Sequence, residues 1–214
     1  MAVPILIADD HSLVRDGLRM NIEAQEDFKV VGEAINGREA LTKAVELRPS
    51  VIIMDIAMPD MNGIEATSVI CERLPGIKVL ILSMYCSLEH SFRALHAGAT
   101  GYLLKESAGD EVVMAVRTIM KGRYFFGAGV PVPLKNGGTE HYNRHKSPLE
   151  SLSHREREVL QFVVEGKSST EIATLLTLSS KSVDTYRSRL MHKLGITNIP
   201  SLVSFALKHG IIPP

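Results

Sequence analysis

Four short apolar runs in the first half of the chain constrain its fold more strongly than any other feature. The runs are Ile5–Ala8, Val51–Met54, Val79–Leu82 and Tyr102–Leu104. Runs of this length, rich in β-branched and aliphatic residues and separated by stretches of helical periodicity, are typical of buried parallel strands. A further run, Phe28–Ala34, is expected to be a strand nearer an edge. Five such strand–helix units predict an α/β doubly wound (βα)5 domain with three layers.

Each of the four runs ends on polar residues that suit phosphoryl chemistry. Asp9 and Asp10 follow the first run, Asp55 the second, Ser83 the third and Lys105 the fourth. In open α/β sheets the working groups lie just past the carboxyl ends of the strands. We therefore expect three carboxylates, one hydroxyl and one ammonium to meet at one edge of the sheet.

Asp55 is the candidate phosphoryl acceptor of this set. A carboxylate is already ionised at pH 7, so it needs no general base, but three neighbouring carboxylates need a cation between them. Mg²⁺ takes oxygen ligands and fits that role. Lys105 and Ser83 can contact phosphoryl oxygens. Any one of these residues alone is more often a loop or cap residue, so the prediction depends on the whole ordered set.

Composition narrows the class of protein. No apolar run reaches the roughly 18 residues of a membrane span, and Met1–Pro4 lacks the charged start of a secretory signal. The two cysteines, Cys71 and Cys86, form no motif and are expected to be reduced thiols in a cytoplasmic protein. Residues 1–125 carry a net charge of −4 and residues 126–214 a net charge of +4. This difference favours a cation site in the N-terminal part and an anionic partner for the C-terminal part.

A segment rich in glycine and proline separates two parts of the chain. Residues 125–148 lack helical or strand periodicity, and their length exceeds that of ordinary loops. We predict domains at 1–124 and 149–214 joined by this flexible linker. His141 and His145 are four residues apart within it, but nothing predicts a helix there, so we expect no metal site.

The C-terminal part is predicted to be all-α, with four helices. Ser153 with Glu156, and Ser168 with Glu171, have the spacing of capping boxes that start the first two helices. A short turn then leads to a third helix over about 181–194, and a fourth covers about 200–209. Two helices joined by a tight turn, the second richer in cations, indicate a helix-turn-helix domain.

The third helix has an apolar face and a polar face. Val183, Leu190 and Leu194 should pack inward. The polar face is where a recognition helix meets base edges, and residues beside it reach phosphates. A solvated polar face is the plain alternative, which the tight turn and the cation excess disfavour. The candidate base-facing residues are Lys181, Asp184, Thr185, Ser188 and His192, and the candidate phosphate contacts are Arg187, Arg189 and Lys193.

The N-terminal motifs resemble the receiver domain of two-component response regulators. The resemblance rests on Asp9–Asp10, Asp55–Gly63, Leu82–Ser83 and Gly101–Lys105. It implies that a sensor histidine kinase phosphorylates Asp55, with Mg²⁺ held by Asp10, Asp55 and the Ala57 carbonyl and with Asp9 assisting. It also implies that Ser83 and Tyr102 form a switch pair. Many receivers have proline after the lysine, whereas this chain has Glu106.

The C-terminal segments 152–160, 171–173, 181–183 and 193–196 resemble the LuxR-type helix-turn-helix. Together the two parts resemble a NarL/FixJ-type response regulator over nearly the whole chain. That resemblance implies base contacts by Asp184, Thr185 and Ser188, and a homodimer on promoter DNA, with RNA polymerase as a further candidate partner. Some relatives carry lysine at the position of Asp184, so their operator sequence cannot be transferred to this chain.

Two alternatives remain open on the sequence alone. One is a DNA-binding regulator whose receiver responds to an input other than phosphorylation. The other is a metal-dependent phosphatase. Such enzymes often have a second acid two residues after the nucleophile, where this chain has Ala57. We therefore expect no enzyme activity beyond self-phosphorylation and self-dephosphorylation at Asp55.

Overall fold

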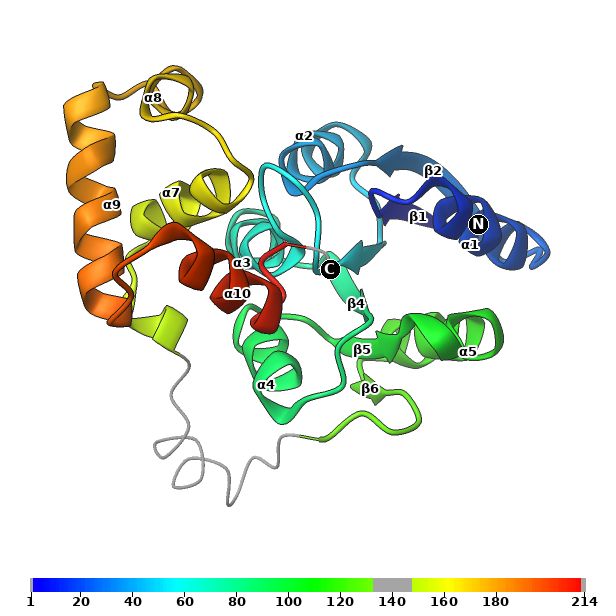
Figure 1. The fold of residues 1–214 in the computed structure, drawn as a ribbon. Coiled ribbons are helices and arrows are strands. Elements are labelled where there is room, and N and C mark those ends of the chain that lie inside the picture. The colour runs from blue at the N-terminus through cyan, green and yellow to red at the C-terminus, as the bar shows by residue number, and fades with distance from the viewer. Residues whose placement is uncertain (1, 133–147, 213–214) are drawn as a thin grey trace. The chain divides into compact units, whose positions relative to one another are not determined.

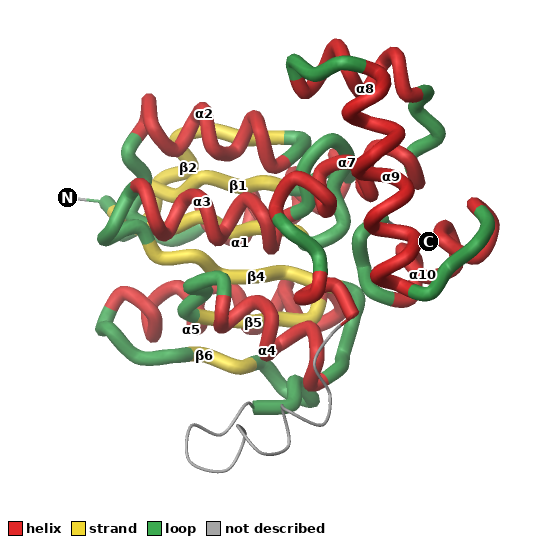
Figure 2. The backbone as a smooth tube through the Cα atoms, turned by 90° about the vertical axis from the view of Figure 1, so that its left-hand side faces the viewer, coloured by secondary structure: helices red, strands yellow, loops and turns green. Residues whose placement is uncertain are grey.

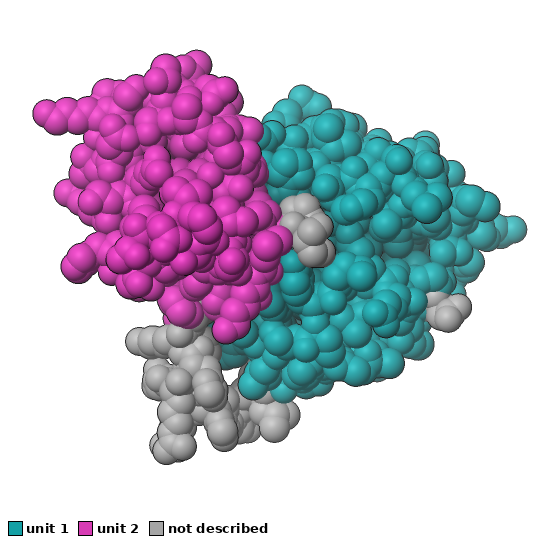
Figure 3. Space-filling model, viewed as in Figure 1, with its two compact units in different colours: residues 1–134 teal, residues 135–214 magenta. Residues whose placement is uncertain are grey.

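The structure is a computed structural model that describes residues 2–132 and 148–212. The chain forms two compact units, residues 1–134 and 135–214 (Figure 3). In these described parts, no helix is both long enough and apolar enough to cross a bilayer.

Unit 1 is built on a single six-stranded sheet in which every neighbouring pair is parallel (Figures 1 and 2). The strand order is β2-β1-β3-β4-β5-β6, so the chain changes direction across the sheet between β1 and β3. This confirms the doubly wound α/β prediction. The strands are β1 (Val3–Ala8), β2 (Phe28–Ala34), β3 (Val51–Asp55), β4 (Lys78–Ser83), β5 (Gly101–Leu104) and β6 (Phe125–Phe126).

Helices cover both faces of this sheet, so the strands are buried on both sides. On one face α1 (Ser12–Glu23) and α5 (Ala108–Met120) pack against β1, β3, β4 and β5 through one apolar cluster. On the other face α2 (Gly37–Leu47), α3 (Gly63–Arg73) and α4 (Leu88–His96) form a second cluster. Asn36, Asn62 and Ser87 cap these three helices by accepting from backbone N–H groups of the first turn.

The sixth strand lies at the predicted start of the linker. Phe125 and Phe126 pair with β5, and the backbone N–H of Gly127 donates to the Tyr102 carbonyl at 2.9 Å. Val130 is buried in the core. Unit 1 thus extends past residue 124, because these apolar side chains find a place on the sheet edge that local periodicity does not reveal. His141 and His145 lie outside the described residues.

Unit 2 is all-α, as predicted. It contains a short 3₁₀ turn, η2 (Pro148–Ser151), followed by α7 (His154–Val164), α8 (Ser169–Leu176), α9 (Ser180–Leu194) and α10 (Ile199–Lys208). Both predicted capping boxes form, so α7 and α8 begin where Ser153 and Ser168 place them. The turn between α8 and α9 contains Thr177 in the left-handed region, with φ 54°. That conformation is costly for a β-branched residue and makes the turn sharp.

Candidate functional site

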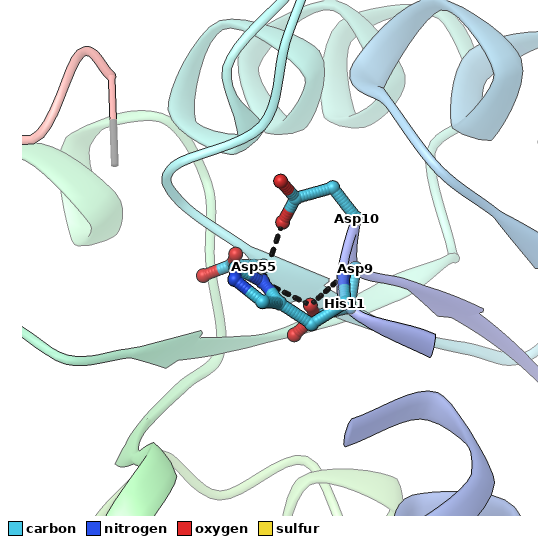
Figure 4. Close-up of side chains that lie close together, drawn as sticks. All are labelled: Asp9, Asp10, His11 and Asp55. Carbon is cyan, nitrogen blue, oxygen red and sulfur yellow. Dashed lines mark hydrogen bonds and ion pairs between the residues drawn. The ribbon is translucent and has the colours of Figure 1, made fainter. Parts of the chain in front are cut away.

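The first candidate site lies at the carboxyl ends of β1 and β3, where the strand order reverses. Such a switch point leaves a crevice at the sheet edge. Asp9 and Asp10 follow β1, and Asp55 ends β3. Each offers a ligand atom, as does His11, and these atoms all lie within 4.8 Å of one another (Figure 4). The predicted meeting of the three carboxylates therefore occurs.

Lys105 joins two of these carboxylates. Its ammonium nitrogen lies 2.8 Å from Asp9 Oδ2 and 2.8 Å from Asp55 Oδ2. The Asp9 and Asp55 side chains are only 1% and 3% exposed. Lys105 follows β5, two strands away from β3 in the sheet, so it reaches across the edge. One cation thus offsets the repulsion between two buried acids.

Burial and neighbouring charge shift the proton affinities of this pair. Burial, together with the charge of Asp9, raises the pKa of Asp55 from its ordinary 3.8 to about 6, although Lys105 opposes the shift. Burial lowers the pKa of Lys105, but the Asp55 and Asp9 carboxylates outweigh it, so the pKa is raised overall. At pH 7 Asp55 is mostly ionised and Lys105 is charged, which is the state a nucleophilic carboxylate requires.

The raised pKa of Asp55 predicts a pH dependence of stability. The folded state binds this proton more tightly than the unfolded state does, so the stabilisation is present below pH 3.8 and is lost as the pH rises through about 6. A shift of this size corresponds to about 3 kcal/mol. Urea unfolding of metal-free wild type and Asp55→Asn should show wild type losing about this amount relative to the variant between about pH 4 and 7. A constant difference across that range would contradict the shift.

The loop after β3 has a tightly folded backbone. The N–H of Gly63 donates to the Ile56 carbonyl at 2.9 Å, and Asp60 adopts a left-handed φ of 62°. Ala57, whose carbonyl is a predicted metal ligand, is buried in this loop. The loop thus brings the start of α3 back against the Asp55 backbone.

Ser83 and Tyr102, the predicted switch pair, are both buried. The Ser83 hydroxyl oxygen accepts from the Tyr85 backbone N–H at 3.0 Å. The Tyr102 hydroxyl donates to the Tyr85 carbonyl at 2.7 Å. Burial also raises the pKa of Tyr102, so its hydroxyl remains a neutral donor. Both side chains therefore bond to the same residue of the β4–α4 loop.

Sequence reasoning missed two residues at this edge. His11 lies beside Asp10, and its Nδ1 is 2.8 Å from Asp10 Oδ1. Arg15 donates from its guanidinium to the Asp9 carbonyl at 2.7 Å and pairs with Glu33 of β2 at 2.9 Å. Their nearness to Asp10 in the sequence could have suggested both residues, because His11 is adjacent to Asp10 and Arg15 lies one helical turn later.

The donor set fits a hard divalent cation. Asp9, Asp10 and Asp55 supply carboxylate oxygens of the kind Mg²⁺ prefers. Asp10 Oδ1 is a buried oxygen that receives no hydrogen bond from the described residues, whereas Asp9 Oδ2 is ion-paired with Lys105. A buried acceptor left without a hydrogen bond costs about 1–3 kcal/mol, which a bound cation would offset.

The second candidate site is the polar face of α9. Val183 and Leu190 are fully buried, which confirms the predicted inner face. The outer residues are exposed except for Arg187, which is half-buried. The exposed residues among those predicted to contact DNA are Lys181, Asp184, Thr185, Ser188, Arg189, His192 and Lys193.

Three of these residues have partners within unit 2. The Asp184 carboxylate accepts from the Ser169 hydroxyl of α8 at 2.6 Å, which ties the two helices together. The Thr185 hydroxyl donates to the Lys181 carbonyl at 2.9 Å. The Lys193 ammonium lies 2.7 Å from Glu156, a buried member of the first capping box. Lys193 therefore has a structural partner, which the helix pattern alone did not indicate.

Each of the two units matches a known protein family. Residues 5–117 match the family described as "Response regulator receiver domain". Residues 150–206 match the family described as "Bacterial regulatory proteins, luxR family". The first range contains the acid cluster and Lys105, and the second contains α7, α8 and α9.

Two curated relatives match this chain over nearly their whole length. The oxygen regulatory protein NreC of Staphylococcus epidermidis is 38% identical over 97% of this chain and 98% of its own length. The response regulator protein VraR of the same species is 36% identical over 99% of this chain and 100% of its own length.

Solved structures agree with these relatives. RcsB of Salmonella enterica serovar Typhimurium, bound to promoter DNA in the presence of the phosphomimetic BeF₃⁻, has a TM-score of 0.57 and is 27% identical over 96% of this chain and 98% of its own. The response regulator ChrA of a heme-sensing system has a TM-score of 0.51 and is 31% identical over 99% of both chains. The chain therefore belongs to the NarL-type two-component response regulators, which join a receiver domain to a LuxR-type helix-turn-helix DNA-binding domain.

Proposed function

We propose that the receiver accepts a phosphoryl group on Asp55 from a histidine kinase and thereby controls DNA binding by unit 2. The observation that carries this proposal is the Asp55 carboxylate, which is 3% exposed and lies 2.8 Å from the Lys105 ammonium. Beside it lie Asp9 and Asp10, and the three acids each offer a ligand oxygen within 4.8 Å of the others. Such a pocket favours the binding of a divalent cation, and the cation would attract an anionic phosphoryl group.

Asp55 is the nucleophile of the transfer. One of its carboxylate oxygens attacks the phosphorus, and the phosphorus–nitrogen bond of the kinase phosphohistidine breaks. The bond's electron pair stays on the kinase imidazole, which takes a proton from water. Asp10, Asp55 and the Ala57 carbonyl would hold Mg²⁺, with Asp9 assisting, and the bound ion would supply positive charge for the phosphoryl oxygens. The one other reaction proposed for this chain is slow hydrolysis of its own phosphorylated Asp55 by water.

We propose that Lys105 and Ser83 contact the phosphoryl group once Asp55 is phosphorylated. Phosphorylation adds about −1.5 to −2 charge to a side chain. Lys105, now shared by Asp9 and Asp55, can then bond a phosphoryl oxygen. Ser83 can donate its hydroxyl to another, and moving it would disturb the bond it receives from Tyr85. Tyr102 is bonded to the same residue, so it is the proposed second member of the switch.

The exposed face of α9 is the proposed DNA-reading surface. Thr185 and Ser188 lie toward base edges in this proposal, and Arg187 and Arg189 toward phosphates. Asp184 can accept from a cytosine amino group, but its bond with Ser169 must then be shared or broken. One solved RcsB structure contains two dimers bound to two parallel DNAs, and we propose a homodimer here too. We propose RNA polymerase as a further partner of the DNA-bound form.

The coupling is testable by measuring DNA affinity with and without phosphoryl donor. Sites would first be selected from genomic DNA with full-length protein treated with acetyl phosphate and Mg²⁺. We expect the dissociation constant for these sites to fall by about 5–150-fold on treatment, the usual range of coupling between two sites. Chelating Mg²⁺ before treatment should remove the effect. Equal affinity under all conditions, while Asp55 is demonstrably phosphorylated, would refute the switch.

A further inference from the structure

After β6 the chain stays packed against the edge of the sheet instead of leaving it. The backbone N–H of Val130 donates to the Gly127 carbonyl at 3.1 Å, which closes a turn. Gly129 lies in this turn with a left-handed φ of 77°, a conformation that glycine adopts without strain. The Val130 side chain is only 7% exposed and packs in the same apolar cluster as Tyr102. Residues 127–131 are called the strap below.

Two side chains from α4 and the loop before it contact the strap. The Ser91 hydroxyl, on a residue that is 1% exposed, donates to the Pro131 carbonyl at 2.8 Å. The Cys86 thiol donates to the Gly129 carbonyl at 2.9 Å, but a thiol is a weak donor and adds little to the hold. Ser91 also lies 3.2 Å from the Leu88 carbonyl, so its hydroxyl keeps an acceptor when the strap leaves. Release therefore strands no buried donor at Ser91.

The other end of the strap fits closely against β5 and α5. The Gly127 N–H donates to the Tyr102 carbonyl at 2.9 Å. A Cβ on Gly127 would lie 2.7 Å from Leu103 Cδ2 and 2.9 Å from Glu111 Oε2. The backbone N–H of Ala128 lies 3.3 Å from the same carboxylate. The strap thus bridges β5 and α5 to α4.

The strap is bonded to the same small group of residues as the switch pair. Ser83 and Tyr102 both bond to Tyr85, and Cys86 follows Tyr85 directly. The strap bonds to the Tyr102 carbonyl and the Cys86 thiol. Movement of Ser83 toward a phosphoryl group on Asp55 would break its bond with Tyr85 and shift the loop that carries Cys86. Because packed segments are bistable and do not stretch gradually, such a shift favours release of the strap.

We propose that residues 127–131 are a regulatory strap. In its docked position the strap holds the switch pair in the unphosphorylated arrangement and restrains DNA binding by unit 2, and phosphorylation of Asp55 releases it. Because coupling between two sites is reciprocal, releasing the strap by mutation should favour the DNA-binding state without phosphorylation. This inference rests on the proposed function, because it names the segment through which the same switch acts.

Alkylation of Cys86 in the full-length protein measures the position of the strap. The chain has two cysteines, so Cys71→Ser leaves Cys86 as its one thiol. The rate of reaction with N-ethylmaleimide is measured before and after treatment with acetyl phosphate and Mg²⁺. We expect the rate to rise by at least about fivefold on treatment, the lower end of coupling between sites. Amide hydrogen exchange of residues 125–132 should become faster with it. Adding Asp55→Asn to this background should remove both changes.

Two release variants and one control test the strap itself. Ser91→Ala removes the donor to the Pro131 carbonyl and keeps α4 intact, because alanine favours a helix. Without phosphoryl donor, this variant should show faster alkylation of Cys86 and tighter DNA binding, each by at least about threefold. Val130→Ala weakens the buried apolar contact and should act in the same direction. Ala128→Ser changes an exposed side chain of the strap and should match wild type.

The outcomes separate this inference from the proposed function. If Asp55 becomes phosphorylated but the hydrogen exchange of the strap does not change, the strap does not respond to the switch and the inference is overturned, even where Cys86 reacts faster. If both release variants bind DNA as wild type does, the strap does not restrain DNA binding and the inference is equally overturned. In both cases the proposed function stands. If wild type accepts no phosphoryl group at Asp55, the proposed function fails and the inference falls with it.

Discussion

Replacing Asp55 with Asn is expected to abolish phosphoryl incorporation from acetyl phosphate. The amide has no anionic oxygen to attack phosphorus, whereas the Asp55 carboxylate is mostly ionised at pH 7 despite its raised pKa of about 6. Intact-protein mass spectrometry should show one added phosphoryl group on wild type with Mg²⁺ and none above background on the variant. Hydroxylamine, which cleaves acyl phosphates, should remove the group from wild type.

Asp60→Asn is the matched control for this experiment. Asp60 lies in the same loop and has a left-handed φ of 62°, a conformation that asparagine also tolerates. The control should accept the phosphoryl group as wild type does. Undiminished incorporation in Asp55→Asn would instead mean that another side chain is the acceptor, and the role of the Lys105 pair would have to be reassigned.

Replacing Gly63 with Ala is expected to give a large loss of stability for the addition of a single methyl group. A Cβ there would lie 1.8 Å from the Asp55 carbonyl oxygen and 2.8 Å from its carbonyl carbon. These are backbone atoms, so the strand end that carries Asp55 would have to move. Overpacking of this kind typically costs about 1–3 kcal/mol and sometimes more, and we expect the upper end. Urea unfolding measures the loss, and phosphoryl incorporation should fall in parallel.

Gly17→Ala is the same chemical change with the opposite expected sign. Gly17 lies within α1, and a Cβ there meets no atom within 4 Å. Alanine in a helix interior is favoured over glycine by roughly 0.5–1 kcal/mol. The variant should therefore be more stable than wild type by about that amount while phosphoryl incorporation is unchanged. Destabilisation by both substitutions would show that the close approach at Gly63 is not the cause.

The sequence was sufficient for five of the six strands, for the two helices that begin with capping boxes and for the convergence of the acids. Five of the strands appear as apolar runs such as Val51–Met54, and parallel strands end at one edge of the sheet, which predicts that Asp10 and Asp55 lie close together there. Ser153 and Ser168 start their helices through bonds to residues three positions later, which are visible in the local sequence. These features depend on periodicity and short spacing, which the linear chain displays directly.

Tertiary structure alone decided the contacts between residues that no local pattern connects. The Lys193 ammonium pairs with buried Glu156, 37 residues away, and Ser169 bonds Asp184 across two helices. Phe125 and Phe126 extend the sheet only because β5 leaves an edge for them. The raised pKa of Asp55 likewise depends on burial and on the nearness of Asp9. Burial and through-space charge are properties of the packed molecule, so they become readable only once distant segments are in place.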